Sequence, residues 1–347
     1  MMKAKNQFQI LSMFLLFVWM SFPALAKSDN LYEKTISKEF VVNPDVQLVL
    51  SGKYGDMHLT TNKSNKVSIT IQVSIETKND RKGQDKLDEI QFDISGNAKK
   101  VEAITKDFSG NFNKLDINWQ VSLPEGASLV VDEQFGDVFI NSINGKTDFT
   151  VKYGKLEANE LRNAENKLHL EFSKAKIEKS PYIDAYVRYS KSFELGEVKH
   201  LIIDSQYSTL DIQSVGRIEL KSAYDNIDID AVAEIISKSK FTDIELDWLT
   251  QKAEMTTSYG DIEINSIEND FKGIDVEASF SDVELTFKSG VSIDLDAYAS
   301  FGDISIPSGY WKKEKGDFSE TVRGAHNGGH TEVRVRLSYG DLKIGVD

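Results

Sequence analysis

The chain has 347 residues, no cysteine and a formal net charge of −14. Without cysteine there is neither a disulfide framework nor a lipid-attachment cysteine, so packing and backbone pairing must hold the fold. The acidic balance does not suit a basic groove, and we expect no nucleic-acid partner.

Residues 1–26 have the pattern of a secretory signal peptide. Lys3 and Lys5 precede an apolar run from Phe8 to Phe22, and small residues stand at Ala24 and Ala26. We expect cleavage before Lys27, which would take the net charge to −16 because both lysines leave with the segment. The alternative is a membrane anchor, but the run is shorter than the roughly 20 apolar residues that a spanning helix needs. No later stretch is apolar enough, so we expect no transmembrane segment after cleavage.

Residues 27–133 are expected to form an N-terminal β region and cap. The tripeptide Tyr54-Gly55-Asp56 ends one repeat-like unit, and an alternating strand covers residues 67–75. The charged stretch between Asn79 and Asn113 is typical of long loops with one or two strands, and residues 84–89 favour a helical turn.

Residues 134–306 carry a repeat built on an aromatic, a small and a polar residue. The aromatic residues stand 18, 19, 17, 18, 17, 17, 18, 21 and 21 residues apart. They are Phe135, Tyr153, Phe172, Tyr189, Tyr207, Tyr224, Phe241, Tyr259, Phe280 and Phe301.

Period-two alternation flanks each aromatic residue. Around Tyr259, for example, Ile262 and Ile264 are apolar and Glu263 between them is charged. Such alternation predicts strands with one buried face. One unit cannot bury that face alone, whereas stacked units pair through their backbones about 4.8 Å apart, and ten would form a rod about 50 Å long.

The fold class predicted is therefore all-β, a single-stranded β-solenoid (β-helix) with coils of about 18 residues and capped ends. A β-propeller remains an alternative, because two units approach the 40-residue period of a blade, whereas a β-sandwich would show no such regular motif. Residues 307–347 are expected to form a C-terminal β cap. They hold an alternating strand at residues 331–337 and a last Tyr339-Gly340-Asp341.

The ten aromatic residues are candidates for a structural ladder. Each continues the alternation of the strand before it, so its ring should face inward or lie over the corner where the chain turns. The small residue that follows suits a tight bend, and Gly or Asp there tolerates positive φ. The alternative is a surface ladder on which sugars stack.

The polar position two residues after each aromatic changes sign along the chain. Lys155, Lys174 and Lys191 occupy it first, and Asp243, Asp261, Asp282 and Asp303 occupy it later. Stacked in register, the four aspartates would repel one another, and calcium could relieve the repulsion. The alternative is that Asp serves only as a turn residue pointing into solvent.

Nothing in the sequence predicts catalysis. His326 and His330 flank a glycine-rich loop, and they could hold a metal only with ligands from elsewhere. No nucleophile elbow, phosphate loop or dinucleotide fingerprint occurs, and acidic pairs are too common to single one out. We expect a protein without catalytic residues and without a cofactor other than that calcium.

The run from Val121 to Leu129, followed by Phe135-Gly136-Asp137-Val138 and by successive Gly-Asp and Gly-Lys turns, resembles the bacterial putative adhesin domain. It is similar, less closely, to the head domains of putative autotransporter adhesins. The resemblance covers most of residues 40–306 and implies an exported β-repeat protein.

We therefore expect an exported, non-catalytic interaction protein of the cell envelope, located in the periplasm, on the outer surface or in the medium. Its partner would be an envelope protein, a matrix or a polysaccharide, bound along a repetitive face. A polysaccharide-active β-helix enzyme and a periplasmic structural or assembly factor are the alternatives.

Overall fold

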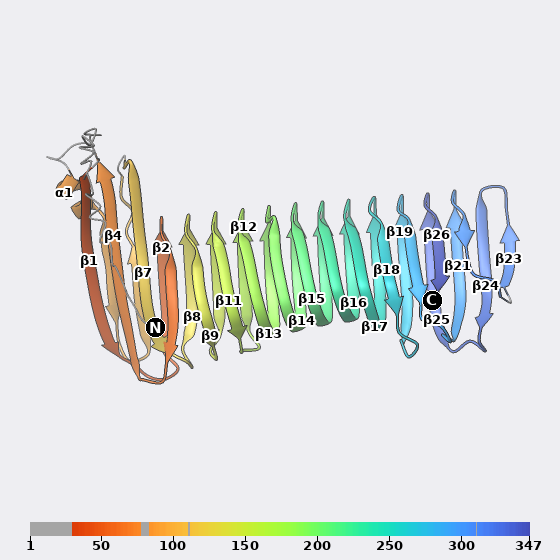
Figure 1. The fold of residues 1–347 in the computed structure, drawn as a ribbon, viewed down its shortest axis with the longest axis horizontal. Helices are drawn as coiled ribbons and strands as arrows, with labels where there is room; N and C mark the ends of the chain where they lie inside the picture. Colours follow the sequence, from red (N-terminus) through yellow and green to blue (C-terminus); the bar gives the residue numbers. More distant parts are fainter. Residues whose placement is uncertain (1–29, 78–82, 110–111, 310) are drawn as a thin grey trace, which may run out of the picture.

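The computed structural model describes residues 30–77, 83–109, 112–309 and 311–347, and the predicted signal peptide lies outside them. These residues form 26 strands and one short helix, and the strands belong to one long open sheet. Figure 1 shows the strands side by side along the long axis of the molecule, from β1 at one end to β23 at the other. In this part of the chain, no helix is long and apolar enough to cross a membrane.

The N-terminal end consists of seven strands and the helix. They are β1 (Asn30–Val41), β2 (Gln47–Lys53), β3 (Met57–Asn62), β4 (Lys66–Thr77), α1 (Gly83–Glu89), β5 (Phe92–Gly96), β6 (Lys100–Thr105) and β7 (Lys114–Pro124). β1, β4 and β7 pair antiparallel, and β7 then pairs parallel with β3. The helical turn expected at residues 84–89 is part of α1, and β5 and β6 are the strands of this stretch, where one or two were expected.

The repeats form strands that pair in parallel. The shorter strands are β8 (Ser128–Gln134), β9 (Val138–Ile143), β10 (Thr147–Lys152), β11 (Lys155–Leu161), β12 (Asn166–Glu171), β18 (Ile262–Ile267), β19 (Gly273–Ser279), β20 (Val283–Phe287), β21 (Ile293–Ser300) and β22 (Ile304–Ser305). The longer ones are β13 (Lys174–Arg188), β14 (Ser192–Gln206), β15 (Thr209–Ala223), β16 (Asn226–Lys240) and β17 (Asp243–Ser258).

The strands lie in two rows. A first row follows each aromatic residue and a second row precedes it, and each long strand runs through both. Neighbouring long strands pair at sequence offsets of 17 or 18, as in Thr209 with Asn226 and Lys174 with Ser192. The repeat length therefore sets the register of the pairing.

Alternate side chains of both rows meet in one continuous apolar core. Ile262 and Ile264 are almost completely buried, while Glu263 between them is exposed. The alternation read from the sequence therefore decides which side chains leave water, and their burial is the main stabilising contribution.

The order in space departs from the order in sequence near the C-terminus. β25 (Thr331–Ser338) pairs in parallel with both β19 and β21, so it lies between them. β26 (Leu342–Val346) likewise lies between β20 and β22. Residues 331–346 are thus inside the stack and not at its end, where the sequence analysis placed them.

The end of the stack is a hairpin. β24 (Ser319–His326) pairs antiparallel with β21, and β23 (Trp311–Lys315) pairs antiparallel with β24. Four of the five residues of β23 are charged, a composition that discourages pairing with another chain at an exposed edge.

Candidate interaction surfaces

The ten predicted aromatic residues come together as one stack of rings, with two further members. Tyr54 stacks on Phe135 at one end, and Tyr339 lies between Phe280 and Phe301 near the other. Adjacent ring centroids in this twelve-membered aromatic ladder are 4.6–5.2 Å apart, with planes within 8° of parallel. Because each inner ring is covered on both faces, the ladder presents ring edges to solvent, and this geometry does not suit sugars that stack on ring faces.

The rings lie outside the core. The ten predicted members are 44–52% exposed, so the inward orientation is wrong, and the corner position is the one observed. Each aromatic residue also adopts a left-handed backbone conformation, with φ between 51° and 64°. The sequence analysis assigned positive φ to the following small residue instead. The left-handed turn directs the ring out of the alternation of the preceding strand, and we attribute both differences to it.

The small residue after the ring has a packing role. A Cβ placed on Gly154 would be 1.9 Å from the carbonyl oxygen of Gly136 in the neighbouring repeat. Where the position holds serine, the hydroxyl can accept a bond from the neighbouring backbone, as Ser208 Oγ accepts one from the N–H of Ser190 at 3.1 Å. Backbone approach, not positive φ, therefore explains the small residue.

The aspartates two residues after the rings form a hydrogen-bonded column. Asp243 Oδ1 accepts a bond from the backbone N–H of Asp261 at 3.0 Å, and Asp261 Oδ1 accepts one from Asp282 at 2.8 Å. Asp341 continues the column between Asp282 and Asp303, again at 2.8 Å on each side. Each of the first four carboxylates therefore fixes the next strand through one oxygen.

The lysine half of that position is shorter than expected. Lys155 is paired with Lys174, but Lys174 is paired with Ser192 and not with Lys191. One extra residue follows the turn at Tyr189, which moves Lys191 out of register. The spacing of the aromatic residues does not show this insertion, but the alternation could have, since Phe193 and Leu195 follow Tyr189 by four and six residues and not by three and five.

A second acidic column lies beside the first, in the first row of strands. Six carboxylates occupy successive paired positions, namely Glu194, Asp211, Asp228, Glu245, Glu263 and Glu284. Partial burial raises the pKa of Asp228, and the negative charges of Glu245 and Asp247 raise it further. Within residues 30–77, 83–109, 112–309 and 311–347, no group of three or more histidine, aspartate or glutamate side chains is arranged to hold a metal ion.

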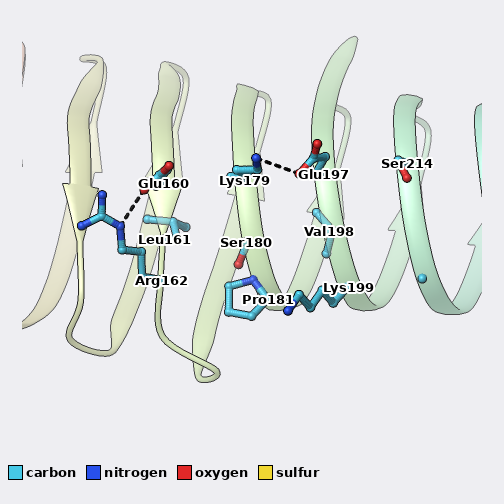
Figure 2. Close-up of a pocket in the computed structure, with 11 residues that line it drawn as sticks. Glu160, Leu161, Arg162, Lys179, Ser180, Pro181, Glu197, Val198, Lys199 and Ser214 are labelled. Carbon is cyan, nitrogen blue, oxygen red and sulfur yellow. Dashed lines mark hydrogen bonds and ion pairs between the residues drawn. The ribbon is translucent and has the colours of Figure 1, made fainter.

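A groove runs along the corner opposite the aromatic ladder, where the chain passes from the first row to the second. Its volume is about 530 Å³, and buried Leu161 and Val198 contribute to its lining. Arg162 Nε bonds Glu160 at 2.6 Å, and Lys179 Nζ pairs with Glu197 at 2.9 Å (Figure 2). The charges of these two ion pairs cancel within the groove wall.

The acids with the clearest burial effects lie inside the core. Burial raises the pKa of Glu133 to about 9, and Glu133 is fully buried. Burial also raises the pKa of Asp225, which accepts bonds from Ser222 Oγ at 2.6 Å and the Ser208 N–H at 2.7 Å. Glu133 was missed by the sequence analysis, although its place two residues before Phe135 is an inward one.

The histidine pair is not assembled into a site with other acidic or imidazole ligands in the described part of the chain. The His326 ring lies parallel to Trp311, with centroids 6.1 Å apart. His326 ends β24, and His330 immediately precedes β25. His326 therefore belongs to the terminal hairpin, whereas His330 leads into a strand inside the stack.

Several solved structures are similar to this chain over most of its length, at low sequence identity. A putative adhesin from Parabacteroides distasonis is similar over 90% of this chain and 97% of its own, with 10% identity and a TM-score of 0.36. A putative adhesin from Parabacteroides merdae matches 90% of this chain and 96% of its own (10% identity, TM-score 0.31). A putative lipid binding protein from P. distasonis matches 89% and 96% (12% identity, TM-score 0.29).

No curated protein matches the sequence. The sequence pattern of one family, however, matches residues 47–345, which include every repeat and both acidic columns. The chain therefore belongs to the Toastrack family, DUF4097.

Proposed function

We propose that this protein is an exported, non-catalytic interaction protein of the cell envelope that binds a polymer or protein partner along its repetitive surface. The observation that supports the proposal is that side chains of the same kind occupy equivalent outward positions on successive strands. Six consecutive acidic positions and twelve stacked rings present the same chemistry at each strand spacing. A repetitive partner could make the same contact many times on such a surface, and many weak contacts together give strong binding.

The proposal includes an architecture. We infer a β-solenoid with coils of about 18 residues, with a signal peptide at 1–26, an N-terminal cap at 27–133, repeats at 134–306 and a C-terminal cap at 307–347. The antiparallel strands at both ends support the capped ends. The insertion of β25 and β26 among the repeats means that the C-terminal segment would serve as cap and repeat together.

An enzyme acting on polysaccharide is the less supported alternative. Catalysis by acids requires perturbed carboxyl groups that a substrate can reach. Glu133 and Asp225 are perturbed by burial, but they are at most 6% exposed. Asp228 is exposed and its pKa is also raised, but its paired neighbours are the acids Asp211 and Glu245, so neither paired position holds a basic residue. A periplasmic assembly factor remains a further alternative, and capture of a defined envelope complex in the absence of glycan binding would favour it.

Shortening the rod tests the proposal. Deletion of residues 209–225 joins Ser208 to Asn226, which is paired with Thr209 and so occupies the equivalent position. We expect saturable binding to envelope extracts, matrix proteins or glycans. The shortened chain should bind more weakly while keeping the circular dichroism spectrum of a β-sheet protein. Full-length protein that binds none of these would refute the proposal.

Calcium binding by Asp243, Asp261, Asp282 and Asp303 stays a prediction. Each of these carboxylates except Asp303 uses one oxygen on a neighbouring backbone N–H, which leaves the other for a cation. Thermal melting with millimolar calcium should then show a higher Tm than melting with a chelator. Identical melting curves would refute it.

A further inference from the structure

The groove continues toward an exposed tryptophan. Strand pairing places six outward residues in one row along this corner, in the order Glu160, Lys179, Glu197, Ser214, Ala231 and Trp248. The groove covers the first four positions. Trp248 lies two strands beyond Ser214, about 10 Å at the usual spacing, and only the methyl group of Ala231 stands between them.

The indole ring is held in place on one side. Lys288 Nζ is 4.5 Å from its centroid and pairs with Glu268. Glu268 is also near the Trp248 side chain, and this proximity lowers the pKa of the carboxyl group after the larger effect of Lys288. The residue paired with Trp248 on the other side is Ala231, which is too small to cover a ring, and Trp248 is 46% exposed.

An exposed, fixed indole face differs from the aromatic ladder. In the ladder, neighbouring rings cover both faces of each inner ring, and only edges reach solvent. At Trp248 one face is covered by a lysine, and on the other side the paired residue is Ala231, in the direction of the groove. A ring already fixed by its neighbours loses little conformational entropy on binding, which favours affinity.

We propose that this groove and Trp248 form a binding site for an uncharged polysaccharide, a proposal that rests on the interaction function above. The indole face would pack against the apolar C–H face of one sugar ring, and the chain of sugars would run along the groove across the strands. Ser214 Oγ and Lys199 Nζ, both on the groove lining, are placed to bond sugar hydroxyls. Figure 2 shows Lys199 extended beside Pro181 at the lower edge of the groove.

Charge selects the uncharged class of ligand. The protein carries −14, so an anionic polymer is repelled at long range. In the groove, the charges of Arg162 and Lys179 are already matched by Glu160 and Glu197, and Lys199 adds one further positive charge to the lining. A hydroxyl-rich neutral ligand can accept a bond from Lys199, and the carboxylate oxygens of the two acids can accept bonds from its hydroxyls.

Two substitutions test the site in the full-length protein. Trp248→Ala removes the platform, and Ser214→Tyr fills the groove at an exposed position without removing a core side chain. Tyr298→Ala is the matched control, because Tyr298 is a 38% exposed aromatic residue of β21 in the second row. Binding to dextran, mannan and cello-oligosaccharides is measured by affinity electrophoresis and calorimetry, with polygalacturonate as the acidic probe.

We expect at least one neutral probe to bind, both groove variants to weaken that binding tenfold or more, and Tyr298→Ala to leave it within twofold. Circular dichroism melts confirm that the variants are folded. Neutral glycan binding that survives both groove substitutions would overturn the proposal while leaving the interaction function standing. Binding of only polygalacturonate, or only of envelope proteins, would overturn it in the same way, whereas a chain that binds nothing would overturn both.

Discussion

Glu133 gives the chain a pH dependence that can be isolated by one substitution. Its carboxyl group lies over Gly52 of the paired strand, where an added Cβ would be 2.2 Å from Glu133 Oε2. Neither carboxyl oxygen makes a well-formed hydrogen bond in the described part of the chain, although the backbone N–H of Gln134 is close enough to lower the pKa and so to offset part of the effect of burial. Burial raises the pKa from 4.5 to about 9, and the nearby charges of Asp56 and Asp137 act in the same direction. The group is therefore protonated in the folded protein at neutral pH.

The direction in which stability changes with pH depends on whether the folded or the unfolded chain holds the proton. Between pH 4.5 and about 9, the folded chain keeps a proton that the unfolded chain has released. Stability should be full below pH 4.5, fall as pH rises through this window and level off above pH 9. One pKa unit corresponds to about 1.4 kcal/mol, so the whole shift sets a ceiling of about 6 kcal/mol.

The substitution Glu133→Gln keeps the shape of the protonated group and cannot ionise. We expect it to remove most of the loss of stability between pH 5 and 9, measured by urea denaturation and by hydrogen exchange of β2 and β8. Glu263→Gln, at an exposed position, is the matched control and should leave the profile of the wild type unchanged. A Glu133→Gln profile parallel to the wild type would refute the assignment of a buried, protonated carboxyl.

Three further predictions concern the repeats. Ile262→Asp should cost several kcal/mol in urea denaturation because it leaves a charge in the core, whereas Glu263→Lys should cost little, and equal losses would contradict the alternation. Tyr224→Ala removes the stacking on two neighbouring rings but keeps a φ of 61°, and it should lower the free energy of unfolding by about 1–3 kcal/mol. Tyr224→Gly should be the less destabilised of the two variants, because glycine adopts a positive φ without strain. In strands alanine is usually more stable than glycine. If Tyr224→Ala were the more stable variant, the backbone of residue 224 would not be strained by its positive φ. Asp228→Asn should stabilise the fold, because it removes both the burial of a charge, which is the larger cause of the raised pKa of Asp228, and the repulsion by neighbouring acids. The part of the gain that comes from repulsion should shrink in high salt, and a gain that does not change with salt would refute a contribution from repulsion.

The local structure of the repeats was accessible from the sequence because it depends on alternation over a few residues. Ile262 and Glu263 were assigned to opposite sides correctly for that reason. Whether the aromatic rings face the core or the solvent could not be predicted in the same way. The alternation alone would carry each ring inward, and a left-handed turn at that very residue reverses it.

The pairing between segments far apart in the chain also could not be predicted from the sequence. The period gives the length of a repeat but not which repeats are neighbours, and thus Tyr339 and Asp341 were not placed among the repeats. The shift of Lys191 by one residue, in contrast, was detectable in the alternation that follows it. The acid at position 133 could have been noticed, since the corresponding residues before the next three rings are Val151, Leu170 and Val187.

The insertion of β25 and β26 constrains how the protein is made. Residues 293–305 are synthesised before residues 331–346, yet their backbone pairing to the earlier repeats runs through these later strands. During synthesis, one edge of β19 and one edge of β20 therefore stay open until the later segment has been made. A chain cut short before residue 331 would keep two such edges, each able to recruit another chain. The strand pairing of β19 to β22 is therefore complete only when residues 331–346 are present, and chains that lack them should be prone to aggregation.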